Sequence, residues 1–226
     1  SDVYHAASNW CKNAVPGSSA NIVIPVVTSG RYPRLNNQNA QVANIQIDDG
    51  ATMDLDANSF VITGAITGNG KFKGGANSTL QFTGTGSAGT VYLDQSTNST
   101  KTIGSLTMNR TSSGSLTLGS NAIISSLTLT SGNIDIGNND LVVTTSSSHS
   151  TSSHIKSTGT GKIKTAISNG SSFTFPIGNT AYNPITITNN TGAADSFSVN
   201  LVDEVYASYD ASGVGTTLMT GPRVKR

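Results

Sequence analysis

Four aspartates stand close together in this sequence, and their type and spacing could support chemistry. Asp48, Asp49, Asp54 and Asp56 lie within nine positions of one another. Glycoside hydrolysis needs two carboxyl groups roughly 5 to 10 Å apart, and carboxylate oxygens also suit calcium, a hard cation. A third interpretation is structural: Asp48 and Asp49 form a turn with Gly50, and Asp54 points outward from a strand. We expect no catalytic residue and no metal centre, and retain the four aspartates as weak calcium candidates.

Basic residues and histidines form no comparable constellation. Six basic residues are available to a polysaccharide lyase: Arg31, Arg34, Lys71, Lys73, Lys101 and Arg110. Their spacing does not predict matching positions on neighbouring repeats. The histidines, His5, His149 and His154, lie in irregular or serine-rich stretches, where we expect polar surface residues rather than a zinc site. No nucleophile, Walker or Rossmann motif occurs in its required context, so the sequence predicts that the protein is not an enzyme.

A repeated Ser-Leu-Thr unit supplies a second set of polar residues. It occurs at 105–107, 115–117 and 126–128. Because alternate side chains of a strand point to opposite faces, stacked copies would bury the leucines and present Thr107, Thr117 and Thr128 as an outward ladder. Stacked threonines suit strands for their shape and hydrogen bonds. A ladder of hydroxyls and methyls could also bind a sugar polymer or ice, so the structural, glycan-binding and ice-binding interpretations all stay open.

The aromatic residues divide into two groups. The phenylalanines occupy apolar positions of predicted strands, where we expect them in the core. Exposed tyrosine rings could serve as sugar-binding platforms, and the candidates are Tyr32, Tyr92, Tyr206 and Tyr209.

Short alternating segments must position these residues. An apolar, a polar and an apolar residue recur between turns of Gly, Ser, Asn and Thr, as at 106–108, 116–118, 127–129, 134–136 and 141–143. Alternation with period two predicts strands. A sandwich strand usually needs about five or six residues, whereas shorter strands suffice in a coil whose turns stack on one another. The predicted fold is all-β: a right-handed parallel β-helix, or β-solenoid, with a short antiparallel β region at the C-terminal end.

The same patterns divide the chain into three parts. Residues 1–43 are predicted to form an N-terminal cap and first strand, and residues 44–170 the parallel β-helix. Residues 171–226 are predicted to form an antiparallel β segment that begins a further domain, since the longer strands 183–188 and 196–201 are joined by an Asn-Asn-Thr-Gly turn. A sandwich stays open as an alternative for this last part.

Composition limits the partners. The chain has 226 residues, of which 11% are charged, and a formal net charge of +1. It lacks the cluster of Lys and Arg that nucleic acid requires and an apolar run of about 18 residues that could span a membrane. The single Cys11 excludes an internal disulfide and is expected to be an inert, half-buried thiol. A weakly charged surface rich in Ser, Thr and Asn is typical of extracellular β proteins, which predicts an extracellular or cell-surface location.

Three segments resemble the β-helical surface proteins of Bacteroidetes. Trp10 with residues 15–17 and 21–25 resembles their opening W…VP…(D/N)-V-x-I-P, and residues 131–141 resemble their G-x-L-x-L-G-x-N-x-L rung. Residues 173–185 are similar to their F-x-F-P-(V/I)-G…Y-x-P-(V/I) junction. The resemblance implies a large, modular, exported adhesin or a cargo of the type IX secretion route, with the secretion machinery as one partner.

In those proteins a strand resembling V-x-R-x-W-x-I follows the junction and enters a β-sandwich. Here Arg223-Val224-Lys225-Arg226 stands about where that strand would begin, and no sorting domain is visible, so the resemblance implies an N-terminal fragment. We therefore expect a non-enzymatic structural or adhesive β-solenoid module of a larger secreted or cell-surface protein, with a glycan or cell-surface protein as its ligand. The alternatives are a polysaccharide-binding or polysaccharide-degrading β-helix and an ice-binding protein.

Overall fold

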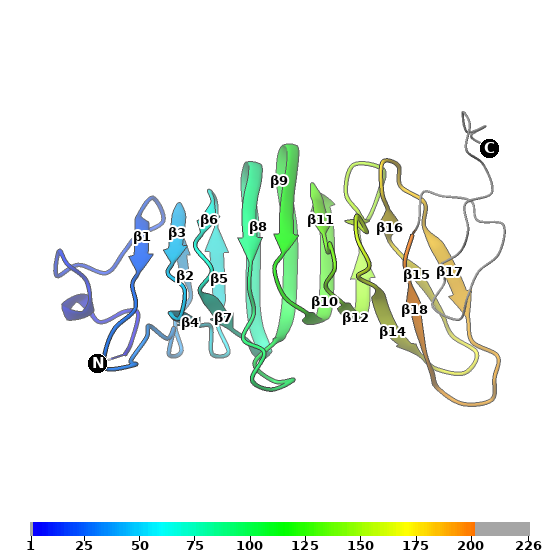
Figure 1. Ribbon diagram of the computed structural model, residues 1–226, viewed down its shortest axis with the longest axis horizontal. Helices are drawn as coiled ribbons and strands as arrows, with labels where there is room; N and C mark the ends of the chain where they lie inside the picture. The colour runs from blue at the N-terminus through cyan, green and yellow to red at the C-terminus, as the bar shows by residue number, and fades with distance from the viewer. Residues whose placement is uncertain (1, 202–226) are drawn as a thin grey trace.

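The computed structural model describes residues 2–201 and shows a coil of short strands wound in successive turns (Figure 1). About 8 turns stack along one axis, with 52% strand and 2% helix. Neighbouring turns pair in parallel, and among the named strands of residues 2–201 antiparallel pairs occur only at the C-terminal end. The predicted all-β class, the parallel solenoid and the short antiparallel region are thereby confirmed.

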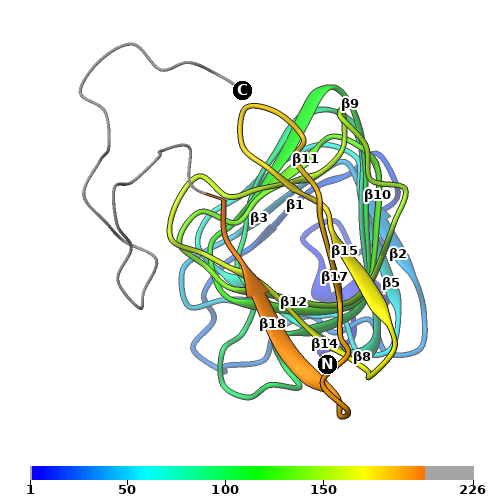
Figure 2. The same ribbon diagram turned by 90° about the vertical axis from the view of Figure 1, so that its right-hand side faces the viewer.

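Three faces surround the interior, as the view along the axis shows (Figure 2). We name each face after one residue on it. The Thr117 face contains the ends of β8 and β9 and six short strands: β1 (Asn21–Ile24), β3 (Asn44–Ile47), β6 (Ile66–Thr67), β11 (Asn133–Asp135), β13 (Ile155–Lys156) and β16 (Ile177–Gly178). The Thr107 face is formed by β2 (Ala40–Val42), β5 (Ser59–Ile62), β8 (Gly75–Val91), β9 (Thr102–Leu118), β10 (Ala122–Ser131) and β12 (Leu141–Ser147).

The third face, the Asp54 face, contains β4 (Thr52–Asp54), β7 (Lys71–Lys73), β14 (Ile163–Ile167) and the first residues of β9, β10 and β12. The interior of the coil is a single apolar cluster. Its residues meet because the parallel register aligns apolar positions, as in the column Ile22, Ile45 and Ile66 and in the column Leu80, Leu106 and Leu127. Burial alternates along the short strands, since one side chain in two points inward.

Two strands are much longer than the sequence pattern predicts. β8 and β9 each run for 17 residues and turn a corner of the coil, where their register shifts between Thr85 and Ser87 and again between Ser87 and Thr90. Thr83 pairs with Asn109, Gly84 with Arg110, and Thr85 with Thr111 across this corner. The two strands therefore stay paired for several residues into the corner. β9, for example, joins the segments 106–108 and 116–118, which the sequence pattern separates.

Different devices close the two ends of the coil. At the N-terminal end, the segment around η1 (Ala7–Asn9) packs against the first turn, with Tyr4 fully buried and the Trp10 Nε1–H donating to the Tyr4 carbonyl oxygen at 2.7 Å. At the C-terminal end, β18 (Asp195–Val199) pairs antiparallel with β14, and β15 (Ser172–Phe175) pairs antiparallel with β17 (Ile185–Thr188). Antiparallel strands at this end occupy the edge that another parallel turn would otherwise use.

The stack extends beyond its predicted limits. Residues 1–43, expected to form a cap and a first strand, contribute both β1 and β2 to parallel pairs, and β16 continues the stack past residue 170. Tyr206, Tyr209, the Arg223–Arg226 terminus and the expected further domain lie outside the described residues. Within residues 2–201, no helix has the length and apolar character needed to cross a membrane.

Candidate functional site

The four aspartates do not converge on one site. Asp54 lies on β4 and accepts a hydrogen bond from the Lys73 Nζ at 2.8 Å, and Asp56 accepts one from the Arg34 Nη2 at 3.0 Å. Asp48 and Asp49 lie separately in the turn after β3, where the Asp48 carboxylate accepts from a neighbouring glutamine side chain at 2.8 Å. The carboxylates of Asp54 and Asp56 therefore pair with cations rather than with one another.

A row of alternating charges on the Asp54 face was not predicted. The parallel register places Arg34 beside Asp54 and Asp54 beside Lys73. Arg34 and Lys73 are two turns apart, with Asp54 in the same column on the turn between them. The hydrogen bond and charge of Asp54 raise the pKa of Lys73 above its ordinary value. Sequence spacing hides this row because the loops between its members differ in length.

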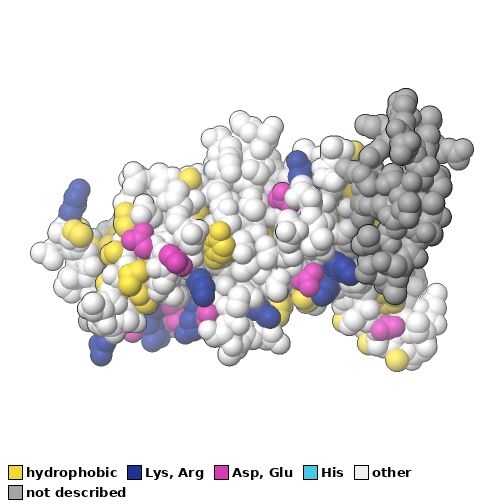
Figure 3. All heavy atoms as spheres, viewed as in Figure 1, with side chains coloured by type: hydrophobic (Ala, Val, Ile, Leu, Met, Phe, Trp, Pro, Cys, Tyr) yellow, Lys and Arg dark blue, Asp and Glu magenta, His cyan; other side chains and the backbone are white. Residues whose placement is uncertain are grey.

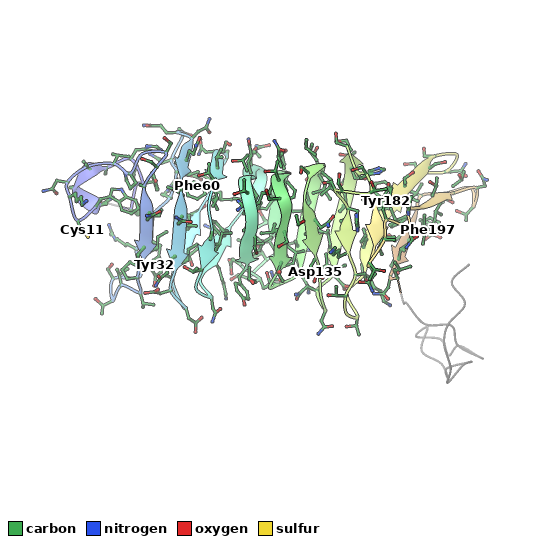
Figure 4. The ribbon with its side chains drawn as sticks, turned by 90° about the horizontal axis from the view of Figure 1, so that it is seen from above. Cys11, Tyr32, Phe60, Asp135, Tyr182 and Phe197 are labelled. Carbon is green, nitrogen blue, oxygen red and sulfur yellow. The ribbon has the colours of Figure 1, made fainter. Side chains whose placement is uncertain are left out.

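A concave site adjoins this row, and we call it the charged groove. It is lined by Asp2, Gly30, Arg31, Tyr32, Arg34, Thr52, Asp54 and Lys73. Tyr32 is half-buried near the N-terminal end of the coil (Figure 4). The exposed Arg31 forms no ion pair within residues 2–201. Charged side chains are visible along the lower edge of the N-terminal half of the molecule (Figure 3).

The arrangement gives little support to a calcium site at the aspartates. Calcium takes six to eight oxygen ligands, usually including several carboxylates, whereas Asp54 and Asp56 are each occupied by a cation. In the part of the chain that the structure describes, no group of three or more His, Cys, Asp or Glu side chains could hold a metal ion.

The structure brings together two of the three predicted ladder threonines. Thr107 and Thr128 are direct partners on the Thr107 face, whereas Thr117 lies on another face and pairs with Asp135. All three point outward, and the leucines beside them are buried, as expected. The column through Thr107 continues into Gln81 on one side and through Thr128 into Ser147 on the other. The ladder is therefore a mixed hydroxyl and amide column rather than a regular threonine array.

Arg110 has a role that sequence reasoning missed. It points into the coil at the β8–β9 corner and is only 1% exposed. Its guanidinium meets backbone carbonyl oxygens alone, at distances of 2.5 to 3.4 Å: those of Thr63, Gly64, Thr83, Thr85, Gly86 and Ser87. Burial lowers its pKa below the ordinary value. The alternation of the strand gave the one available signal, since Arg110 follows the buried Met108 by two positions.

Two further polar residues differ from expectation. His154, predicted at the surface, is 3% exposed, and its ring packs 5.6 Å from that of Tyr182. The Tyr182 hydroxyl also lies 2.5 Å from the His149 Nδ1. Cys11, predicted to be half-buried, is exposed. Both errors arise in irregular segments, where no periodic pattern indicates which side chains point inward.

Comparison with known proteins identifies no relative: no protein family, curated protein or solved structure matches this chain. The arguments about function below therefore rest on the residues and their geometry.

Proposed function

We propose that this chain is a structural and adhesive β-solenoid module of a larger exported protein, and that it has no enzymatic activity. The observation that carries the proposal is the unbroken apolar interior, a single cluster that extends from Tyr4 to Val199. Such a coil forms an elongated support, because each turn packs against its neighbours. Its outward side chains are available for contact along the whole length.

The arrangement of carboxylates supports a role without catalysis. A glycoside hydrolase needs two carboxyls that face one substrate, but Asp54 and Asp56 are engaged by Lys73 and Arg34. Low charge and the motif resemblance described above support an extracellular or cell-surface location. They also support export by a route like the type IX system of Bacteroidetes.

The proposal can be tested with labelled protein of residues 1–226. We expect saturable binding to cell surfaces or immobilised glycans, and no turnover of plant, algal or animal polysaccharides with or without calcium. The unfolded variant Leu127→Asp serves as the control for non-specific adhesion. Turnover of any polysaccharide would contradict the proposal.

A second candidate function is polysaccharide binding at the charged groove. The observation that favours it is the half-buried Tyr32 ring beside the unpaired Arg31. An aromatic ring offers an apolar face to a sugar, and guanidinium and carboxylate groups can hydrogen-bond its hydroxyls. We expect Tyr32→Ala to weaken glycan retention in affinity electrophoresis, whereas Tyr92→Ala, on another turn, leaves it unchanged. Equal effects of both variants would contradict this assignment.

A further inference from the structure

A second groove, which we call the hydroxyl groove, lies at the corner between the Thr107 and Thr117 faces. Three consecutive turns line it: residues 110–115 of β9, residues 131–133 between β10 and β11, and Thr151, Ser152 and Lys156 from the next turn. The groove encloses about 480 Å³, within the roughly 300–1,000 Å³ typical of small-molecule sites.

One free cation and no carboxylate line this groove. The buried Arg110 guanidinium points to carbonyl oxygens of the preceding turns, whereas Lys156 forms no ion pair within residues 2–201. Asp135 neighbours Lys156 in the strand register, but its carboxylate accepts hydrogen bonds from the Thr158 hydroxyl at 2.7 Å and the Gly137 N–H at 2.9 Å. Lys156 therefore gives the lining a positive charge that no lining acid balances.

Hydrogen-bond donors make up most of the remaining lining. The side-chain hydroxyls are those of Thr111, Ser112, Ser113, Ser115, Ser131, Thr151 and Ser152. Ser131 already donates to the Arg110 carbonyl oxygen at 2.9 Å and Thr111 to that of Gly84 at 3.4 Å, which leaves the others for a ligand. Ser112 and Ser113 have φ angles of 55° and 56°, in the left-handed region that residues other than glycine seldom adopt. Strained residues of this kind persist where the surrounding structure fixes them, and they occur often at ligand sites.

We propose that the hydroxyl groove binds an oxyanion group, a sulfate or a carboxylate, carried by a glycan. Lys156 supplies a charge-assisted hydrogen bond to the oxyanion, and the hydroxyls of Ser112, Ser113, Ser115 and Thr151 donate to the oxyanion and to neighbouring sugar oxygens. This inference rests on the adhesive role proposed above and deepens it, because it names the chemical class of the ligand.

The test measures binding of four probes to residues 1–226 at fixed salt: dextran sulfate, polygalacturonate, neutral dextran and inorganic sulfate. We expect dextran sulfate or polygalacturonate to bind and neutral dextran to fail, and the stronger of the two charged probes identifies the oxyanion. Lys156→Gln should weaken that binding by about ten-fold, as loss of one charge-assisted contact predicts. Ser152→Glu should abolish it by adding a negative charge to the groove.

The matched control is Lys162→Gln, which removes the same charge from an exposed site outside the groove and should change binding less than two-fold. Thermal melts establish that each variant is folded. Equal losses for Lys156→Gln and Lys162→Gln would overturn the inference and assign binding to diffuse charge. Failure of all charged probes, with cell-surface binding intact, would overturn the groove but leave the adhesive role standing. Failure of surface binding as well would overturn both.

Discussion

At the scale of single residues, the core of this solenoid depends on a buried cation as well as on apolar side chains. A buried charge is costly unless its partners satisfy it. Arg110 of β9 bonds carbonyl groups of the β8 corner and of the turn before β8, so one side chain links three turns. The guanidinium suits this task because its five N–H donors lie in one fixed plane.

We expect Arg110→Met to lower the free energy of unfolding by about 3 kcal/mol, since it leaves several buried carbonyl groups without donors. Arg110→Lys should also destabilise the protein, because a single ammonium cannot reach all of the carbonyls. Urea denaturation measures both effects. Arg31→Met, at an exposed site without an ion pair, should stay within about 0.5 kcal/mol of the wild type. Equal midpoints for the two methionine variants would contradict the role assigned to Arg110.

His154 predicts a pH dependence of stability. Burial lowers its pKa below the ordinary value and the charge of Lys156 acts in the same direction, while backbone groups of Ser150 and Thr151 oppose the shift. The unfolded chain therefore binds a proton more readily than the folded chain does. The stabilising contribution is complete above the ordinary histidine pKa of about 6.5 and is lost as the pH falls through the lower folded value.

We expect the melting temperature to fall between pH 7.5 and pH 5, and the fall to be smaller in His154→Met. Carboxylates titrate mostly below this window, and His5→Met provides the histidine control. An identical pH profile for the wild type and His154→Met would contradict the assignment.

At the scale of single strands, alternation determines which side chains reach the core. In β10, Leu127 is 1% exposed, whereas the preceding Ser126 is exposed on the outer side. The two residues share one strand and one register, with Leu127 beside Leu106 and Ser126 beside Ser105. Leu127 and Ser126 therefore form a matched pair for testing which side chains of β10 point into the core.

We expect Leu127→Asp to destabilise the fold by more than about 4 kcal/mol and unfold it cooperatively, because it buries an unpaired carboxylate. Ser126→Asp, one position away, should change stability by no more than about 0.5 kcal/mol. Thermal melts followed by circular dichroism compare the two variants. An unchanged melt for Leu127→Asp would show that the strand faces the opposite way.

At the scale of the whole molecule, the two ends of the coil are the places where strand pairing between successive turns stops. Every interior turn is paired on both sides, but the last turn depends on β18, which covers β14 in antiparallel register from Ile163 to Ile167. An uncovered edge strand offers backbone groups to another chain and promotes association. Val199, 8% exposed and paired with Ile163, attaches β18 to the apolar interior.

We expect Val199→Asp to detach β18 and to cause association that increases with protein concentration, because it places a carboxylate in the apolar end of the core. Sedimentation velocity measures the association. Ser198→Asp adds the same charge at an exposed neighbouring position and should leave the protein as the wild type. If both variants sediment alike, β18 does not cap the coil.

The sequence by itself determined the local structure and the inward residues. The strands predicted at 106–108 and 116–118 lie within β9, the one at 127–129 lies within β10, the one at 134–136 overlaps β11, and the one at 141–143 begins β12. Period-two alternation is a local property, so a short segment contains all the information needed to assign its buried side. Apolar residues separated by polar ones thus indicated a coil and its core.

Only the tertiary structure decided which polar residues meet. Thr107 reached Thr128 but not Thr117, Arg34 aligned with Asp54 and Lys73, and Arg110 turned inward. The physical reason is that neighbours in a solenoid are set by the number of residues in each turn. That number depends on corners and loops of irregular length, which have no period to read. The register also shifts at corners, as between Thr85 and Ser87 of β8, so the partners on the next face do not follow from counting residues along the sequence.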